Sequence, residues 1–334
     1  VASNDDAAGG LATSSAAFDV AAGTTYQIAV DGYNGASGTV RIGALVLATE
    51  GNAGVTQNTR LLNLAVRGIA GSGSATLTVG FAIAGDSPKP VLLRAVGPTL
   101  GTFGVPGSMP DPVLTLYRAA DAIERNDNWG DNLRANEIVE KGALIGAFPL
   151  PANSRDAALL VNLLPGSYTG QISANGNSAN GVALLEVYDT DYNSDADATG
   201  RRLINVSSRG QVGSGAEIMI AGFVVLGPTP KRILVRGIGP GLSQFGVAGV
   251  LGNPLITVVN GSGVPVGSND NWSSQADAVG VTAASQRVGA FALNTGSLDA
   301  ALVISLPPGA YTVQLAGVGN GTGIGLIEAY ELPD

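Results

Sequence analysis

The chain of 334 residues contains no cysteine and no histidine. These absences exclude disulfide bonds, thiolate and imidazole metal sites, and nucleophilic sites that depend on a Cys–His or Ser–His pair. Charged residues make up 13% of the sequence, against about 25% in an average globular protein. Only carboxylate chemistry or a carboxylate-bound metal remains for catalysis, so the composition predicts a protein that is not an enzyme.

Basic residues are scarce as well, with 17 Lys and Arg against 26 Asp and Glu and a net charge of −9. Nucleic-acid binding needs basic patches, so we expect no nucleic-acid partner. No apolar run approaches the roughly 20 residues of a transmembrane helix, so we expect no membrane span. The chain begins at Val1 without a signal peptide, which predicts a processed product or a piece of a longer protein.

What the sequence does contain is an internal repeat. Six motifs occur twice in the same order, in identical or closely related form. They are Arg-Leu-Leu-Asn (60–63 and 202–205), Gly-Phe (80–81 and 222–223), Leu-Leu-Arg-Ala-Val-Gly-Pro (92–98 and 234–240), Asn-Asp-Asn-Trp (126–129 and 269–272), Asp-Ala-Ala-Leu (156–159 and 299–302) and Pro-Gly-Ser-Tyr-Thr (165–169 and 308–312). Recurrence of this kind indicates two homologous modules within one chain.

The repeat predicts the domain organisation. The first module spans 60–190 and the second 202–334, with an acidic linker at 191–201. Residues 1–48 are interpreted as an incomplete copy that keeps only closing strands, followed by a linker at 49–59. Repeat arrays follow nearest-neighbour energetics, so we expect truncation of Phe81 or Phe223 to destabilise mainly its own module.

The hydrophobic pattern has a period of two. Leu77, Val79, Phe81 and Ile83 alternate with small or polar residues, as expected of a strand with one buried face. Clusters of Gly, Pro, Asn and Asp separate such segments at short intervals, which favours antiparallel sandwiches. We therefore predict an all-β protein of tandem antiparallel β-sandwich, jelly-roll-like modules, with at most one short helix per module. That helix is expected within 131–145 and 274–288.

Several segments carry a resemblance to a known family. The sequence Asp-Pro-Val-Leu-Thr-Leu-Tyr at 111–117, then Asn-Asp at 126–127, then Pro-Gly-Ser-Tyr at 165–168, resembles bacterial pre-peptidase C-terminal domains. Segment 22–33 resembles the closing strands of such a domain. The Gly-Phe and Leu-x-Arg-x-x-Gly-Pro motifs resemble tandem repeats of very large secreted bacterial surface proteins. The resemblance implies a jelly-roll-like β-sandwich and an extracellular or cell-surface location; it implies no activity.

The Asn-Asp-Asn-Trp motif is open to three interpretations. As a turn, its amide and carboxylate side chains bond to nearby backbone groups while the tryptophan anchors the core. As a ligand site, Trp129 and Trp272 offer platforms for a polysaccharide. The third interpretation is a calcium loop.

Oxygen-bearing side chains alternate along the acidic segment after the first module. The candidate calcium ligands are Asp189, Asp191, Asn193, Asp195 and Asp197. Calcium takes about six to eight oxygen ligands, of which this segment supplies several. The pattern is not that of an EF-hand, because Ser194 replaces the turn glycine and Gly200 stands where the bidentate glutamate belongs. Calcium is therefore a candidate cofactor, and a solvated acidic linker is the alternative.

Charged residues also recur inside matched strands. Arg94 and Glu186 have counterparts in Arg236 and Glu328, which predicts one ion pair within each module. Lys89 recurs as Lys231, and the prolines beside both predict an exposed turn. An exposed turn counts against a covalent Lys–Asn link, which needs apolar surroundings and a nearby carboxylate.

The favoured function is that of a structural subunit of an extracellular bacterial assembly: a filament, a sheath or a surface layer. The incomplete first module would leave an apolar face open to association. That predicted interface consists of Tyr26, Ile28, Val30, Val40 and Ile42. It is covered either by the adjacent repeat or, head-to-tail, by a neighbouring subunit, and the second arrangement builds a homopolymer. The alternative function is a non-catalytic polysaccharide-binding or adhesin module that uses Trp129 and Trp272.

Overall fold

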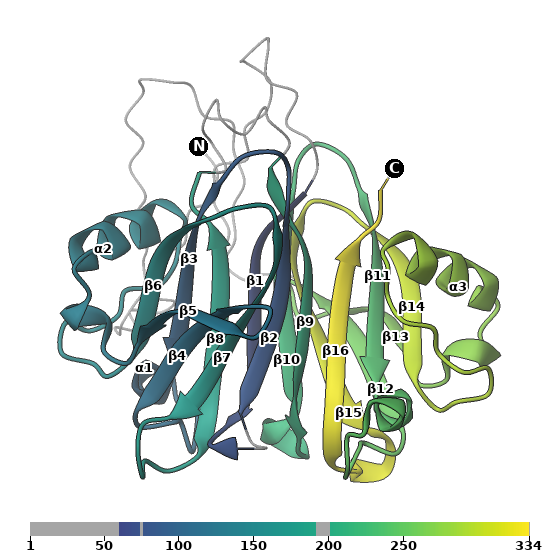
Figure 1. Ribbon diagram of the computed structural model, residues 1–334. Helices are drawn as coiled ribbons and strands as arrows, with labels where there is room; N and C mark the ends of the chain where they lie inside the picture. Colours follow the sequence, from purple (N-terminus) through teal and green to yellow (C-terminus); the bar gives the residue numbers. More distant parts are fainter. Residues whose placement is uncertain (1–59, 74–75, 192–200, 334) are drawn as a thin grey trace, which may run out of the picture. The chain divides into compact units, whose positions relative to one another are not determined.

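The structure is a computed structural model that describes residues 60–333 except 74–75 and 192–200 (Figure 1). These residues all belong to one compact unit, Asn52–Asp334. The predicted incomplete module at 1–48, with its interface residues, and the linker at 49–59 lie outside the described residues.

The described residues form strands that alternate with short turns, and the same eight strands occur in each repeat. In the first repeat they are β1 (Arg60–Ala70), β2 (Leu77–Ala84), β3 (Lys89–Val96), β4 (Pro112–Arg118), β5 (Asp121–Asn126), β6 (Ala157–Leu163), β7 (Gly166–Ala174) and β8 (Gly181–Asp189). In the second they are β9 (Arg202–Val212), β10 (Met219–Leu226), β11 (Lys231–Ile238), β12 (Pro254–Asn260), β13 (Pro265–Asn269), β14 (Ala300–Leu306), β15 (Gly309–Gly317) and β16 (Gly323–Glu331). The predicted all-β class is confirmed.

Strand order is the same in both repeats. In the first, antiparallel pairing gives the rows β1-β8-β3-β6 and β2-β7-β4-β5. In the second, it gives β9-β16-β11-β14 and β10-β15-β12-β13. These two rows of four are the strand orders of an eight-stranded jelly roll.

The two repeats are joined by strand pairing. β1 pairs with β10, and β2 pairs with β9, both antiparallel. Each row of the first repeat therefore continues into a row of the second, so that two eight-stranded rows run across both repeats (Figure 1). We call these two junctions the seams.

A local pseudo-symmetry relates the repeats at the seams. β1 and β9 touch in parallel, with Leu61 opposite Leu203 and Ile69 opposite Gln211, and each pair joins equivalent positions of the two repeats. A Cβ atom on Gly68 or on its equivalent Gly210 would press against the side chain of Leu77. A Cβ atom on Gly210 would also press against the side chain of Met219, so the two glycines make room beside the seams for side chains of β2 and β10.

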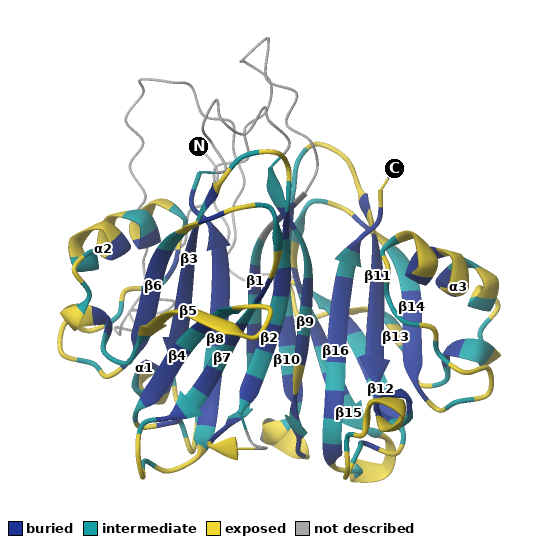
Figure 2. Cartoon of the chain, viewed as in Figure 1, coloured by how far each residue is buried: buried dark blue, intermediate teal, exposed yellow. Residues whose placement is uncertain are grey.

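One hydrophobic core fills the space between the rows. The strand pattern supplies it directly: β2 and β10 alternate buried and half-buried residues along their whole length. A single cluster of buried side chains includes Phe81 and Val91 of the first repeat together with Phe223 and Val235 of the second. Burial is deepest along the strands, and the turns are exposed (Figure 2). This continuity argues against the expectation that each module is energetically independent.

Short helices cover the outer faces of the rows. The expected helices occur as α2 (Ala135–Leu144) and α3 (Ala278–Arg287), inside the predicted ranges. The first repeat also has α1 (Pro98–Thr102), so the limit of one helix per module is wrong there; the equivalent segment of the second repeat is a 3-10 turn. Two satellite clusters of apolar side chains lie beneath α2 and α3.

Candidate functional site

β3 is buried on both faces, and this explains where its charged residue lies. Val91, Leu93 and Ala95 point into the main core, whereas Leu92 lies in the satellite cluster beneath α2. Arg94 shares the outer face with Leu92 because side chains alternate along a strand. Its side chain is therefore enclosed between the sheet and the covering loops, and is almost completely buried.

The buried guanidinium of Arg94 is neutralised by its cross-strand neighbour. Arg94 lies directly opposite Glu186 in the register of β3 and β8. Its Nε and Nη2 atoms lie 2.8 and 2.7 Å from Oε2 of Glu186, and Nη1 donates to the carbonyl oxygen of Phe148 at 2.5 Å. The Tyr188 hydroxyl donates to Oε1 of Glu186 at 2.7 Å. The predicted ion pair of the first module is confirmed.

The second repeat reproduces this arrangement. Nε of Arg236 lies 2.8 Å from Oε2 of Glu328, and its Nη1 donates to the carbonyl oxygen of Phe291 at 2.7 Å. The Tyr330 hydroxyl donates to Oε1 of Glu328 at 2.8 Å. Burial raises the pKa of Glu328 above its ordinary value, although the charge of Arg236 opposes that shift. The second predicted ion pair, Arg236 with Glu328, is thus confirmed.

A second buried carboxylate organises the Gly-Pro turn after β3. Asp156 is fully buried; it accepts the backbone N–H of Gly97 at 2.8 Å and the hydroxyl of Thr99. Its equivalent Asp299 accepts the N–H groups of Gly239 and Gly241 at 2.9 and 3.1 Å. The Asp-Ala-Ala-Leu motif is evident in the sequence as a repeat, but the sequence indicates no role for its aspartate. The signal that could have indicated this contact is that Asp-Ala-Ala-Leu and Gly-Pro recur together in both repeats.

The Asn-Asp-Asn-Trp motif is a structural turn. Asn126 Oδ1 accepts the N–H of Ala158 at 3.0 Å and its Nδ2 donates to the carbonyl of Asn128 at 3.0 Å. Trp129 is 6% exposed, and its indole N–H donates to the carbonyl of Pro151 at 3.0 Å.

The equivalent tryptophan behaves in the same way. Trp272 is also 6% exposed, with its indole N–H donating to the carbonyl of Asn294 at 3.3 Å. Stacking of a sugar requires an open ring face, and both rings are buried in the satellite clusters. Packing of the helices closes over Trp129 and Trp272, which counts against their use as polysaccharide platforms; that use stays a prediction.

The candidate calcium segment divides at the limit of the described residues. Asn193, Asp195 and Asp197 lie outside them. Asp189 and Asp191 are described, and both contact a cation of the chain itself: Nζ of Lys89 lies 2.8 Å from Asp189 Oδ2 and 2.8 Å from Asp191 Oδ1. Among the described residues, no group of three or more acidic side chains is arranged to hold a metal ion.

The position of Lys89 differs from the prediction. Lys89 is 0% exposed rather than part of an exposed turn, because it extends the core-facing row of β3 that continues as Val91 and Leu93. Lys231 is likewise buried, with its Nζ 3.3 Å from Oε1 of Glu331. The neighbouring prolines are compatible with this burial, since Pro88 and Pro230 directly precede the strands and Pro90 lies within β3.

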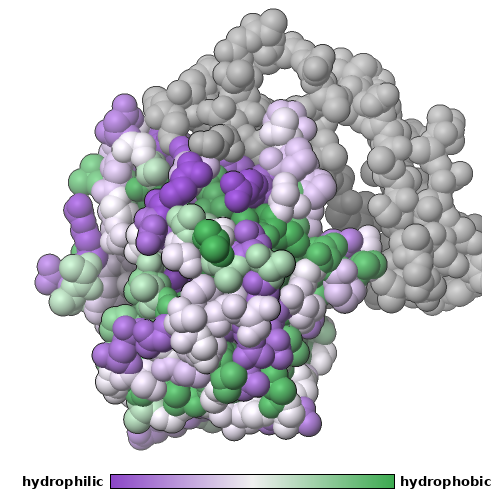
Figure 3. Space-filling view, turned by 90° about the vertical axis from the view of Figure 1, so that its right-hand side faces the viewer, coloured by the Kyte–Doolittle hydropathy of each residue, from purple (hydrophilic) through white to green (hydrophobic). Residues whose placement is uncertain are grey.

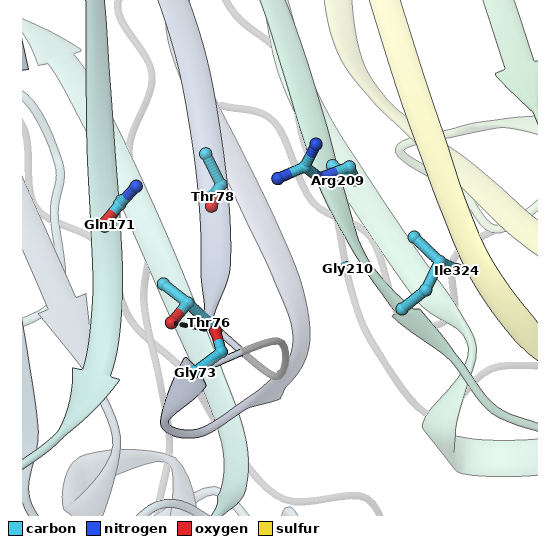
Figure 4. Close-up of a pocket in the computed structure, with 7 residues that line it drawn as sticks. All are labelled: Gly73, Thr76, Thr78, Gln171, Arg209, Gly210 and Ile324. Atoms are coloured by element: carbon cyan, nitrogen blue, oxygen red, sulfur yellow. Dashed lines mark hydrogen bonds between the residues drawn. The ribbon is translucent and has the colours of Figure 1, made fainter. Parts of the chain in front are cut away.

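A small hollow lies on the outer surface near the seam between β2 and β9 (Figure 4). Its volume is about 210 Å³, and its lining residues are Gly73, Thr76, Thr78, Gln171, Arg209, Gly210 and Ile324. The Thr76 hydroxyl donates to the carbonyl of Gly73 at 2.9 Å. The lining offers one guanidinium with hydroxyl and amide groups, so it provides contacts for a small polar group.

No family model and no curated protein matches the chain. Among solved structures, the chain is similar to a protein of the DUF4785 family from Legionella pneumophila, with 8% sequence identity, 89% of each chain covered and a TM-score of 0.21. A likeness this distant carries no functional argument. In the described part of the chain, no helix has the length and apolar character that crossing a membrane requires.

Proposed function

We propose that this protein is a structural subunit of an extracellular bacterial assembly, such as a filament, a sheath or a surface layer. The observation that carries the proposal is the pair of seams, which join two jelly-roll-ordered repeats through backbone hydrogen bonds along β1–β10 and β2–β9. Two modules that serve as independent binding domains need only a linker. Pairing of both rows instead makes one stiff block, as a load-bearing subunit requires.

The contacts that the repeated motif residues make inside the fold support the same proposal. Arg94 and Asp156 are the polar residues most suggestive of chemistry, and both are engaged with partners inside the fold. Trp129 is buried in the same way. The motifs therefore maintain the architecture, which is the pattern expected of a building block.

The two ends of the described unit differ in their surface chemistry, and this difference supports the proposal. β5 is an edge strand whose residues are almost all exposed, and it carries Asp121, Glu124 and Arg125, charges that discourage strand addition. At the opposite end, around α3, apolar side chains lie among polar ones on the surface (Figure 3). The exposed apolar residues of that repeat include Val279, Leu298 and Val266. We propose that assembly is head-to-tail and uses the interface that the sequence predicts at Tyr26, Ile28, Val30, Val40 and Ile42.

Assembly of the full chain tests the proposal. We expect light scattering and negative-stain electron microscopy of the purified chain to show polymers of one width. Ile28→Asp places a charge in the proposed joint and should reduce the chain to monomers. Ile123→Asp is the matched control, because Ile123 is an exposed apolar residue of edge strand β5. A chain that stays monomeric at every concentration, or polymers that tolerate Ile28→Asp, would contradict the proposal.

A further inference from the structure

Lys89 and Asp189, which are fully buried, and Asp191, which is half-buried, form a cluster at one end of the main core. Lys89 begins β3 and Asp189 ends β8, and each continues the core-facing row of its strand. The side chains next in those rows, Val91 and Val187, are fully buried. An amine and a carboxyl group are thus held against each other in apolar surroundings, with 0% of either side chain exposed.

Backbone pairing also positions the second carboxylate of the cluster, that of Asp191. The N–H of Thr190 donates to the carbonyl of Pro90 at 3.3 Å, so the chain continues alongside β3 beyond the end of β8. Asp191 then comes level with Lys89, and its Oδ1 accepts from Nζ at 2.8 Å. Arg201 contacts the other carboxylate oxygen of Asp191 and donates to the carbonyl of Pro88 at 2.7 Å. The cluster therefore contains one amine within reach of two differently placed carboxyl groups.

We propose that Lys89 and Asp189 condense to an intramolecular isopeptide bond, with Asp191 as the group that moves the proton. The Lys89 ammonium first gives a proton to Asp189, which leaves a neutral amine beside a neutral carboxylic acid. Nζ then attacks Cγ of Asp189, the C–O bond to the hydroxyl breaks, and the new N–C bond is an amide. Asp191 accepts the second proton from Nζ and passes it to the departing hydroxyl. The ammonium and carboxylate thus become one amide and one water molecule, with no oxidant or reductant.

The electrostatics of the two carboxyl groups suit these different roles. Burial is the largest influence on Asp189 and raises its pKa to about 7, so the neutral, electrophilic form is accessible. Burial alone would also raise the pKa of Asp191, but hydrogen bonds with Asp189 and Lys89 and the charges of Lys89 and Arg201 hold it below its ordinary value. Asp191 is therefore ionised when a base is needed. Contact of the reacting groups in a rigid, dry site supplies the proximity that such a reaction requires.

The second repeat provides an internal control. Lys231 and Glu331 are the residues equivalent to Lys89 and Asp189, but their Nζ–Oε1 separation is 3.3 Å and Arg202 also lies 3.3 Å from that oxygen. The position equivalent to Asp191 is Pro333, which has no carboxylate to move a proton. We therefore expect one cross-link in the first repeat and an ion pair at the equivalent place in the second.

The mass of the denatured full chain is the primary test. We expect the purified protein to be lighter than its sequence by one water molecule, and proteolysis to release a branched peptide that joins the segments containing Lys89 and Asp189. The chain has three lysines, Lys89, Lys141 and Lys231. An amine-reactive label applied to the unfolded chain should therefore modify Lys141 and Lys231 but leave Lys89 unlabelled.

Variants assign the roles. Lys89→Arg and Asp189→Ala should restore the full linear mass, whereas Lys231→Arg should keep the loss of one water. Asp191→Asn should slow the appearance of the cross-link after synthesis by about 100-fold, the usual loss when a general base is removed. Circular dichroism establishes that each variant is folded.

Two results would overturn the proposal. One is a folded wild-type chain with the full linear mass and a reactive Lys89, which would make the cluster an ion pair only. The other is a water loss that maps to a cyclised aspartate elsewhere in the sequence. The inference does not depend on the proposed assembly, because a cross-linked chain that never polymerises would contradict only the latter.

Discussion

At the scale of single residues, buried charge is the costliest feature of this fold. Arg94 and Arg236 are each enclosed with one glutamate, one tyrosine hydroxyl and one backbone carbonyl. The arginines also lie over phenylalanine rings, with Cζ 4.2 Å from the ring centre of Phe148 and 4.5 Å from that of Phe291. Each member of such a cluster depends on the others, because a buried ion without its partner loses its hydration and gains nothing in return.

Removal of one partner should therefore be worse than removal of both. We expect Glu186→Leu to destabilise the chain by about 3–5 kcal/mol, since it leaves the Arg94 guanidinium buried without a counter-charge. The double variant Arg94→Met with Glu186→Leu should recover most of that loss. Denaturant unfolding of the single and double variants measures both values, and a double variant less stable than Glu186→Leu would contradict this account.

At the scale of elements, Asp156 joins the end of β3 to the start of β6. The turn after β3 brings Gly97 so close to the backbone of Met109 that a Cβ atom there would collide with the Met109 carbonyl. The N–H of Gly97 then needs an acceptor inside the fold, and the Asp156 carboxylate provides it. The same relation holds between Gly239 and Asp299. Two motifs separated by about half of each repeat thus form one structural feature.

Asp156→Ala should accordingly destabilise the chain by about 1–3 kcal/mol or more, because it leaves buried N–H and hydroxyl groups without an acceptor. Asp121→Ala is the matched control, since it removes the same charge from the exposed edge strand β5. We expect the control to stay within about 0.5 kcal/mol of the wild type in thermal or denaturant unfolding. Equal effects of the two substitutions would show that Asp156 is not the acceptor that holds the turn.

At the scale of the whole described unit, the seams convert two repeats into one core. Phe81 and Phe223 belong to the same cluster, and each lies on a strand that pairs with the other repeat: β2 with β9 and β10 with β1. The neighbouring rings repeat the pattern, with Phe81 stacked on Tyr168 and Phe223 on Tyr311. Unfolding one repeat would expose the apolar face and the paired strand of its neighbour.

Thermal unfolding tests that coupling. Phe81→Ala and Phe223→Ala should each cost about 3–5 kcal/mol, as is usual for truncation of a buried phenylalanine. Because the core is continuous, we expect one cooperative transition that both substitutions lower by a similar amount. Two resolved transitions, with each variant moving only one of them, would restore the independence that the repeat alone suggests.

Local sequence patterns were enough to predict many of the strands, helices and ion pairs of this protein. Alternating residues such as those of 77–83 predicted strands because a strand exposes one face and buries the other. Recurrence at matched positions also predicted the pairs Arg94–Glu186 and Arg236–Glu328, because equivalent strands of two copies must place equivalent residues together. The helices at 135–144 and 278–287 were also predicted at equivalent positions of the two copies.

Only the tertiary structure decided how those parts meet. The seams depend on contacts between strands far apart in the sequence, such as β1 and β10, and no local pattern specifies which edge pairs with which. Burial of Lys89 was misjudged for a related reason: a residue's exposure is set by what packs over it, and the covering segments lie elsewhere in the chain. Burial of Trp129 agrees with the interpretation of its motif as a turn whose tryptophan anchors the core. The sequence by itself thus determined the strands and their repetition, while long-range packing determined that the two copies share one core and that an amine meets two carboxylates at its end.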